Sequence, residues 1–402
     1  MVFDISKIIR PNILTLEPYR CARDDFKEGI LLDANENTHG PAIVNITTKE
    51  ESLGLNRYPD PHQVELKDQI VEFRVSESER SQVPNFKFDI PDELKIDYEN
   101  LCLGVGSDES IDSLIRCCIK PGVEKMLICP PTYGMYSICA TVNDVKEIVK
   151  VPLNFDNFQI NKDLLFDTIS KDEAIKLIYL TSPGNPTGKL IDLNDVIEIL
   201  DKIEEISWNG LFILDEAYID FSPIGSSLSV LVNKYKNLVV LQTLSKSFGL
   251  AGIRLGITFA NKEISAVLNA IKYPYNISNL TSDIAIRSTT KESLELMKKN
   301  CDLIIEQREI VLKNLLNLRG VGKNIGGLDS NFILLQIVDK NGEPNNELCI
   351  KVYQNLAVDN SVVVRFRGNE PGCNSCLRIT IGTKEENEIL VSKFEKVLNE
   401  LL

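Results

Sequence analysis

The chain has 402 residues, of which 43% are hydrophobic, so it can bury a large core and is long enough for two domains. Its net charge is −14 at pH 7, and no lysine- or arginine-rich run offsets the acidic excess, which argues against a nucleic-acid partner. Single arginines can still hold small anionic ligands locally.

Cysteine and histidine usage argues against a metal site. The ten cysteines are scattered, several of them inside apolar runs, which is typical of a reducing compartment. Cys373 and Cys376 form the only C-x-x-C pair, and His39 and His62 are the only histidines, so we expect neither a zinc site nor a Ser-His hydrolase. Without a signal-like N-terminus or an apolar stretch of about 18 residues, we expect a cytoplasmic protein without membrane contact.

The first 100 residues read mainly as peripheral structure. Residues 1–60 are rich in turns and prolines, which predicts an N-terminal arm rather than part of the central core. Residues 63–73 are expected to form a helix. The polar, charge-rich stretch 76–97 predicts an insertion or a mobile surface loop.

From about residue 100 to 275, apolar runs alternate with helical patterns. This alternation predicts an α/β fold in which a mostly parallel sheet lies between helices, with ligands at the carboxyl ends of the strands. The expected strands are 101–106, 126–129, 178–181, 211–214, 238–241 and 255–259.

From about residue 280 the pattern changes to that of a smaller α+β domain. A long helical region is expected at 282–318, followed by strands at 332–338, 362–366 and 377–381 and a final helix at 384–402. The predicted organisation is therefore an arm with part of the small domain (1–60), a large α/β domain (61–280) and a small domain (281–402).

One predicted helix start is a candidate anion site. Gly104-Val-Gly106-Ser107-Asp108-Glu109 follows a strand and opens an amphipathic helix whose first N–H groups would face a ligand. The alternative is an ordinary turn that Ser107 or Asp108 caps. Because the third glycine of the dinucleotide fingerprint and a phosphate-loop lysine are both missing, NAD and nucleotide triphosphates are poor candidates.

Lys246 is the main candidate for covalent chemistry. It lies in Thr243-Leu-Ser245-Lys246, at the end of a buried strand and before a glycine-bearing turn. Burial disfavours the charged ammonium, and an amine with a lowered pKa can form a Schiff base with an aldehyde. The alternative is a surface lysine at a strand end.

Polar residues at neighbouring strand ends suggest what that aldehyde is. Asp215 ends a buried strand and needs a positive partner, which a protonated pyridine nitrogen would provide. Asn185 and Tyr218 could donate hydrogen bonds to a phenolate oxygen, and Tyr133 could stack on a ring. Each of these has a structural alternative as a core or turn residue, but together they match the requirements of pyridoxal phosphate.

The motifs that carry these residues resemble a known family. The chain resembles the fold-type I pyridoxal-phosphate enzymes and, within the class-II aminotransferases, the fungal-type histidinol-phosphate aminotransferase family. The resemblance covers nearly the whole chain. Its signals are Glu17-Pro-Tyr19, Asp33-Ala-Asn-Glu-Asn37, Arg57-Tyr-Pro-Asp60, Gly106-Ser-Asp-Glu109, Ser182-Pro-Gly-Asn-Pro-Thr-Gly188, Asp215-Glu-Ala-Tyr218, Thr243-Leu-Ser-Lys246, Ala251-Gly-Ile-Arg254 and Cys376-Leu-Arg-Ile-Thr-Ile-Gly-Thr383.

The resemblance implies roles for the cofactor-binding residues. Lys246 would carry pyridoxal 5'-phosphate and move the substrate proton, while Asp215 would pair with the pyridinium nitrogen. Asn185 and Tyr218 would bind the ring oxygen, and Tyr133 would stack on the ring. The phosphate would be held by Gly106, Ser107, Asp108, Ser245 and Arg254.

The resemblance also implies the substrates and the assembly. Arg365 and Arg378 would bind substrate anions, with Tyr19, Asn37 and Asn185 beside them. Tyr58 would reach the phosphate of a neighbouring subunit, which implies a homodimer. The implied reaction is ping-pong transamination between L-histidinol phosphate and 2-oxoglutarate, giving imidazole-acetol phosphate and L-glutamate, in L-histidine biosynthesis.

Two alternatives to this reading stay open. One is a related decarboxylase or an aminotransferase for aromatic amino acids, and the other is a cofactor-binding regulator on the same fold. The regulator is disfavoured because Lys246, Asp215 and both small-domain arginines are present. Ser247 stands where the family often has alanine, and we expect little effect from this difference.

Overall fold

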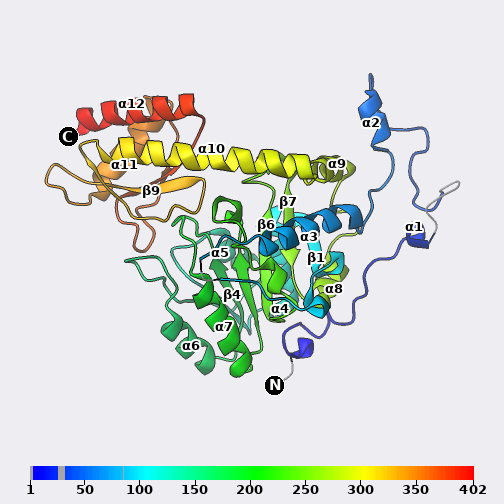
Figure 1. The fold of residues 1–402 in the computed structure, drawn as a ribbon. Coiled ribbons are helices and arrows are strands. Elements are labelled where there is room, and N and C mark those ends of the chain that lie inside the picture. Colours follow the sequence, from blue (N-terminus) through cyan, green and yellow to red (C-terminus); the bar gives the residue numbers. More distant parts are fainter. Residues whose placement is uncertain (1–2, 26–31, 85) are drawn as a thin grey trace.

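Two separate sheets organise the chain (Figure 1). The structure is a computed structural model that describes residues 3–25, 32–84 and 86–402. A seven-stranded sheet has the order β1-β7-β6-β5-β4-β2-β3, and a four-stranded sheet has the order β10-β11-β9-β8. The predicted α/β fold class with a smaller α+β part is confirmed.

The seven-stranded sheet is mostly parallel, with β7 antiparallel to both of its neighbours. Its central strands are continuous apolar runs because helices cover both faces. The pattern missed β3, an edge strand that begins and ends with exposed charged residues. The strands are β1 (Leu101–Val105), β2 (Lys125–Ile128), β3 (Glu147–Lys150), β4 (Ile175–Thr181), β5 (Leu211–Asp215), β6 (Leu238–Thr243) and β7 (Leu255–Phe259).

Two hydrophobic clusters fix the helices to the two faces of this sheet. One cluster joins the sheet to α3 (Val64–Glu79), α6 (Lys162–Lys171) and α7 (Leu193–Glu205). The other joins it to α4 (Gly106–Cys118), α5 (Met135–Val142) and α8 (Lys262–Ile271). The sheet is therefore buried on both sides, and its strand ends are where polar side chains can meet a ligand.

The four-stranded sheet is antiparallel and has its own core. It contains β8 (Val321–Asn324), β9 (Phe332–Ile337), β10 (Arg365–Phe366) and β11 (Cys376–Thr380), and α11 (Asn346–Val358) and α12 (Lys384–Leu401) pack against it. Figure 1 shows α10 (Lys291–Leu316) reaching from the large sheet to this smaller one.

The helical region predicted at 282–318 is confirmed, but it consists of two helices. The segment forms α9 (Asn279–Ser288) and α10, and it is interrupted because the side chain of Thr290 accepts a hydrogen bond from Ser293 N and so begins a new helix. The strand predicted at 362–366 is reduced to β10. The short strand β8 was not predicted, since its sequence, Val-Gly-Lys-Asn, is weakly apolar.

The prediction of a loop over all of 76–97 is also wrong in part. Helix α3 continues to Glu79, and beyond it the described residues contain only η2 (Asp92–Leu94) and irregular chain. The polar pattern of α3 misled the prediction because Arg74 and Ser78 are buried, and Arg74 is held there by ion pairs.

The N-terminal arm begins against the large sheet's helices, where Ile8 and Ile9 are buried in the cluster that contains α4, α5 and α8, so the prediction that the arm stays outside the core is wrong there. Figure 1 shows the later described part of the arm lying away from both sheets. Its described part contains η1 (Ile5–Lys7), α1 (Ala22–Asp25) and α2 (Thr48–Ser52). Glu36 organises the arm: it pairs with Arg23 at 2.5 Å and Arg57 at 2.7 Å, and these partners lower its pKa to about 2. The domain limits at residues 60 and 280 stay a prediction.

None of the helices in the described ranges is long and apolar enough to cross a membrane.

Candidate active site

A cavity of about 400 Å³ lies at the carboxyl ends of the parallel strands. Side chains from the large sheet line one side of it, and arginines from the small sheet line the other. It brings together eleven of the predicted site residues: Ser107, Asp108, Tyr133, Asn185, Asp215, Tyr218, Ser245, Lys246, Arg254, Arg365 and Arg378.

Arg254 and the start of α4 form a cradle for an anion. Gly106 has a φ of +76°, and a Cβ there would lie 2.3 Å from Arg254 Nη2, so only glycine lets the guanidinium approach. A Cβ at Gly256, on the neighbouring β7, would lie 2.5 Å from the carbonyl of Gly106. In the described chain no side chain caps α4, so the capped-turn alternative is not what forms. The first N–H groups of α4 remain available to a phosphate.

Arg254 is itself held in an unusual backbone conformation. Its φ and ψ are 55° and 58°, in the left-handed region that a residue with a Cβ adopts at a cost. Its guanidinium makes only long contacts with the described residues, 3.4 Å to Ala251 O and 3.6 Å to Asp108 Oδ2. Ser245 lies nearby and receives a hydrogen bond from Thr243 Oγ1 at 2.9 Å. The cradle is thus positively charged, and the described residues leave hydrogen-bond donors in it without close acceptors.

Asp215 is a buried carboxylate at the end of β5. It accepts hydrogen bonds from Tyr136 Oη at 2.6 Å and from the Ala217 backbone N–H at 3.1 Å. Burial raises its pKa, and the hydrogen bond from Tyr136 lowers it. Within the described residues it has no ion-pair partner, so the site has room for a cationic group beside it.

Lys246 is half-buried and lies on the cavity wall. In the part of the chain that the structure describes, its Nζ makes no hydrogen bond or ion pair, and it lies 5.5 Å from the centroid of the Tyr218 ring. Burial and then the charge of Arg378 lower the pKa of Lys246, and Asp215 opposes them. The sequence predicted this direction, and a lowered pKa makes the amine a better nucleophile.

Arg378 connects the small sheet to the large one. It lies on β11, and its Nη1 donates to Asn185 Oδ1 at 2.5 Å, in the turn after β4. Its guanidinium also lies over the ring of Phe332, 5.3 Å from the centroid. Tyr218, beside Lys246, is 7% exposed, and burial raises the pKa of its hydroxyl, which keeps the hydroxyl a hydrogen-bond donor.

These features fit pyridoxal phosphate by their chemistry. The cradle suits a phosphate, the unpaired carboxylate of Asp215 suits a protonated ring nitrogen, and the free amine of Lys246 suits an aldehyde. The residues therefore fit this cofactor.

Four predicted site residues are not on the cavity wall: Gly106, which lies beside Arg254 in the cradle, and three residues of the arm. Tyr58 stacks on Tyr275 at 4.4 Å between ring centroids, and Tyr19 meets the same ring edge-on at 5.7 Å. Asn37 accepts hydrogen bonds from His39 N and Asn56 Nδ2 within the arm. All three belong to the N-terminal arm, apart from the cavity of their own chain.

Sequence reasoning missed other groups around the cavity. Thr181, Thr243 and Arg367 line it, and Tyr136 binds Asp215 from behind. Arg367 could have been found from its spacing of two residues from Arg365, since alternate residues of a strand share a face. No local pattern marks Tyr136, which α5 brings to β5 through tertiary packing.

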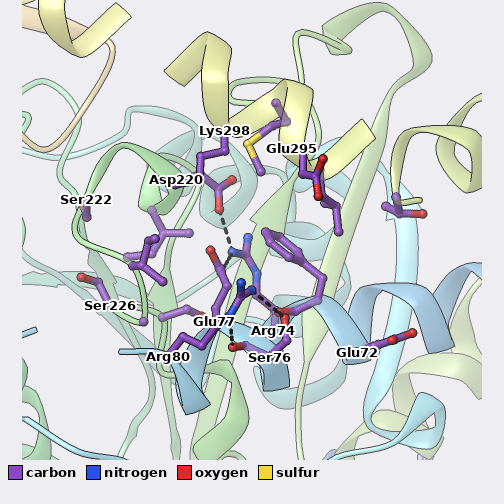
Figure 2. A pocket seen from close by; sticks show the side chains of 18 of the residues that line it. Glu72, Arg74, Ser76, Glu77, Arg80, Asp220, Ser222, Ser226, Glu295 and Lys298 are labelled. Carbon is purple, nitrogen blue, oxygen red and sulfur yellow. Dashed lines mark hydrogen bonds and ion pairs between the residues drawn. The ribbon is translucent and has the colours of Figure 1, made fainter. Parts of the chain in front are cut away.

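A second cavity, of about 610 Å³, is lined by residues of α3, α10 and the segment after β5 (Figure 2). Ser247, the residue after Lys246, donates a hydrogen bond to Asp220, which lines this cavity. Arg74 pairs with Asp220 at 2.7 Å and with Glu77 at 2.6 Å. A buried ion-pair cluster thus contacts the lysine turn through Ser247.

The same cluster reaches the strands that carry the site. Arg74 Nε donates to Gln242 Oε1 at 2.8 Å, and Gln242 Nε2 donates to Glu216 Oε2 at 2.8 Å. Gln242 lies on β6, before Lys246, and Glu216 directly follows Asp215. Arg74 therefore connects the segments that carry Asp215 and Lys246.

The chain matches the family described as "Aminotransferase class I and II" over residues 27–394. It is 61% identical to a histidinol-phosphate aminotransferase of Candida maltosa, with 100% of each chain covered. It is 49% identical to the enzyme of that name from Saccharomyces cerevisiae, over 100% of this chain and 99% of the relative.

Solved structures show the same fold. The histidinol-phosphate aminotransferase of Sinorhizobium meliloti, in complex with pyridoxal-5'-phosphate, matches with a TM-score of 0.73 and 20% identity, covering 92% of this chain and 90% of that one. The enzyme of that name from Clostridium acetobutylicum matches with a TM-score of 0.70 and 24% identity, covering 88% and 93%.

Proposed function

Because the chain belongs to the class I and II aminotransferase family and, within it, to the histidinol-phosphate aminotransferases, we propose that its site interconverts L-histidinol phosphate plus 2-oxoglutarate with imidazole-acetol phosphate plus L-glutamate. The reaction is ping-pong and belongs to L-histidine biosynthesis. The observation that carries the proposal is the Lys246 amine, without an ion pair in the described chain, in one cavity with the buried Asp215.

Pyridoxal 5'-phosphate, the cofactor of this family, supplies an aldehyde that takes up the amino group and a ring that stabilises negative charge at the substrate Cα. Asp215 would hold the ring nitrogen protonated, and Tyr133 would stack on the ring. Asn185 and Tyr218 would donate hydrogen bonds to the ring oxygen. The phosphate would be bound by the N–H groups at Gly106 and Asp108 together with Ser107, Ser245 and Arg254.

Lys246 would act both as the covalent anchor and as the group that moves the proton. Its lowered pKa favours the neutral amine, in which Nζ can take the proton from the substrate Cα and return it later. Arg378 and Arg365 would bind the substrate's anionic group, because planar guanidinium groups accept both carboxylates and phosphates in forked geometry.

We also propose that the protein is a cytoplasmic homodimer in which Tyr58, Tyr19 and Asn37 act on the partner's site. In their own chain these residues lie away from the cavity. The arm also exposes apolar side chains that a second copy could cover, among them Val44, which is 89% exposed. The proposal includes no nucleic-acid or membrane partner.

The test of the reaction is a spectrum of the purified protein before and after each substrate is added. Glutamate and histidinol phosphate should each change the cofactor absorbance, and the glutamate-treated enzyme should aminate imidazole-acetol phosphate. Amination of a phenyl keto acid instead would favour an aromatic aminotransferase, and a spectrum that glutamate leaves unchanged would favour a regulator. Lys246→Ala should abolish turnover without loss of folding.

Mixed dimers test the shared site. A Tyr58→Phe subunit paired with a Lys246→Ala subunit should contain one intact site, because each site takes its lysine and its tyrosine from different chains. The reciprocal control pairs a wild-type subunit with a doubly substituted one, and this dimer should contain no intact site. If the control dimer is the more active of the two, Tyr58 acts within its own chain.

A further inference from the structure

We infer that Arg367 is a third anion-binding residue of the site and selects the phosphate-bearing substrate over glutamate. The inference rests on the proposed function and deepens it by dividing the arginines between the two half-reactions. Among the arginines, the sequence predicted only Arg365 and Arg378 for substrate binding.

The sheet places the three arginines on one face. Arg365 lies directly opposite Arg378 in the antiparallel pair of β10 and β11. The pairing continues beyond β10, because Arg367 N donates to Cys376 O at 2.8 Å. Residues two apart on a strand point to the same side, so Arg367 shares the face of the other two arginines. All three line the 400 Å³ cavity.

The protein leaves this cluster short of acceptors. Arg367 pairs with Glu370 at 3.3 Å, and Arg378 donates to the neutral amide of Asn185. Yet the Nε atoms of both Arg367 and Arg378 are buried without a hydrogen-bond partner among the described residues. Buried donors without acceptors are costly, which indicates that an external anion completes the cluster.

Repulsion among the three guanidinium groups also indicates that an anion binds between them. Burial chiefly lowers the pKa of Arg378, and the charges of Arg367 and Arg365 lower it further. An anion between the guanidinium groups would remove this repulsion and form charge-assisted hydrogen bonds.

The two substrates differ where this cluster would meet them. Glutamate carries a singly charged carboxylate directly on Cα, whereas histidinol phosphate carries a phosphate ester two bonds farther out. A phosphomonoester has a charge of about −1.5 to −2 at pH 7 and three terminal oxygens. Two arginines can satisfy a carboxylate, but a phosphate offers an acceptor and a charge for a third.

The experiment measures KM for both amino donors in the holoenzyme. Arg367→Gln should raise KM for histidinol phosphate about 10-fold or more, since it removes a charge-assisted contact, while KM for glutamate should stay within about twofold. Arg367→Lys should restore part of the loss. Arg287→Gln, which removes an exposed arginine paired with Asp283, is the matched control and should change neither constant.

The carboxylate of Glu370 competes with a bound anion for Arg367, so its neutralisation should strengthen anion binding. Glu370→Gln frees Arg367 from its only ion pair in the described chain, so inorganic phosphate should inhibit the glutamate half-reaction about two- to fivefold more tightly than in the wild type. In Arg367→Gln the same inhibition should weaken about 10-fold. This inhibition assay uses glutamate alone and therefore works even if histidinol phosphate proves not to be a substrate.

The outcomes separate the inference from the proposed function. Equal increases of both KM values in Arg367→Gln would make Arg367 a structural residue, and an unchanged phosphate inhibition in both variants would remove it from the anion site. If the wild type transaminates glutamate but not histidinol phosphate, the proposed substrate is wrong while the phosphate inhibition still decides the role of Arg367.

Discussion

Replacement of Arg74 by methionine should destabilise the protein strongly, although Arg74 lies outside the anion cradle. The variant keeps the apolar stem but removes the charge that Asp220 and Glu77 share. The two carboxylate side chains are only 7% and 17% exposed, so they would be left buried without their cation. Breaking a buried ion pair in this way costs about 3–5 kcal/mol. We expect that loss in the free energy of unfolding at pH 8.

The loss should depend on pH with a definite sign. Burial already raises the pKa of Glu77 in spite of Arg74, and removal of Arg74 raises it further. The folded variant then binds a proton that the folded wild type does not, so the deficit shrinks as the pH falls from 8 towards 5. The recovery can reach about 1.4 kcal/mol for each pH unit in which only the folded variant is protonated.

The assay is urea unfolding of the wild type, Arg74→Met and the control Arg287→Met across this pH range. The control removes an exposed i,i+4 pair and should cost about 0.5 kcal/mol or less at every pH. A deficit below about 1 kcal/mol for Arg74→Met, or one that does not change with pH, would refute the reasoning.

Three other outcomes follow from the buried groups. Tyr136→Phe removes the 2.6 Å hydrogen bond to Asp215, and this loss should raise the pKa of the Asp215 carboxyl. We therefore expect weaker cofactor binding and an acidic limb of the pH–activity profile that is shifted to higher pH. Burial raises the pKa of Glu216 to about 7, above that of the unfolded chain, so this group should lower the free energy of unfolding as the pH rises from about 4.5 to 7, by on the order of 3 kcal/mol in total. In Glu216→Gln, the free energy of unfolding measured across this pH range should lack this decrease. Cys129, whose pKa burial raises to about 12, should resist alkylation at neutral pH until the protein unfolds, which mass spectrometry can follow.

Much of the cavity could be predicted because strand ends converge. Lys246, Asp215 and Asn185 each follow an apolar run, and parallel strands bring such positions to one edge. Arg74 and Tyr136 could not be predicted in this way. Their positions come from packing between elements far apart in the sequence, and a polar helix such as α3 looks like surface until its ion pairs are seen.

Tyr58, Tyr19 and Asn37 mark another limit of the sequence reading. Motifs placed them in the site, but one chain does not bring them to its own cavity. A motif records which residues occur together, not whether they meet within one subunit, and the mixed dimers decide that point.

The length of α10 has a mechanical consequence for the site. Its 26 residues make a rod of about 39 Å, packed at one end against η4 (Ile219–Phe221), next to Tyr218, and at the other against β8 and α12. A tilt of only about 5° about one end would move the other by about 3 Å. The arginines could therefore swing towards or away from Lys246 without any helix bending, and a substitution that kinks this rod should slow product release more than it weakens cofactor binding.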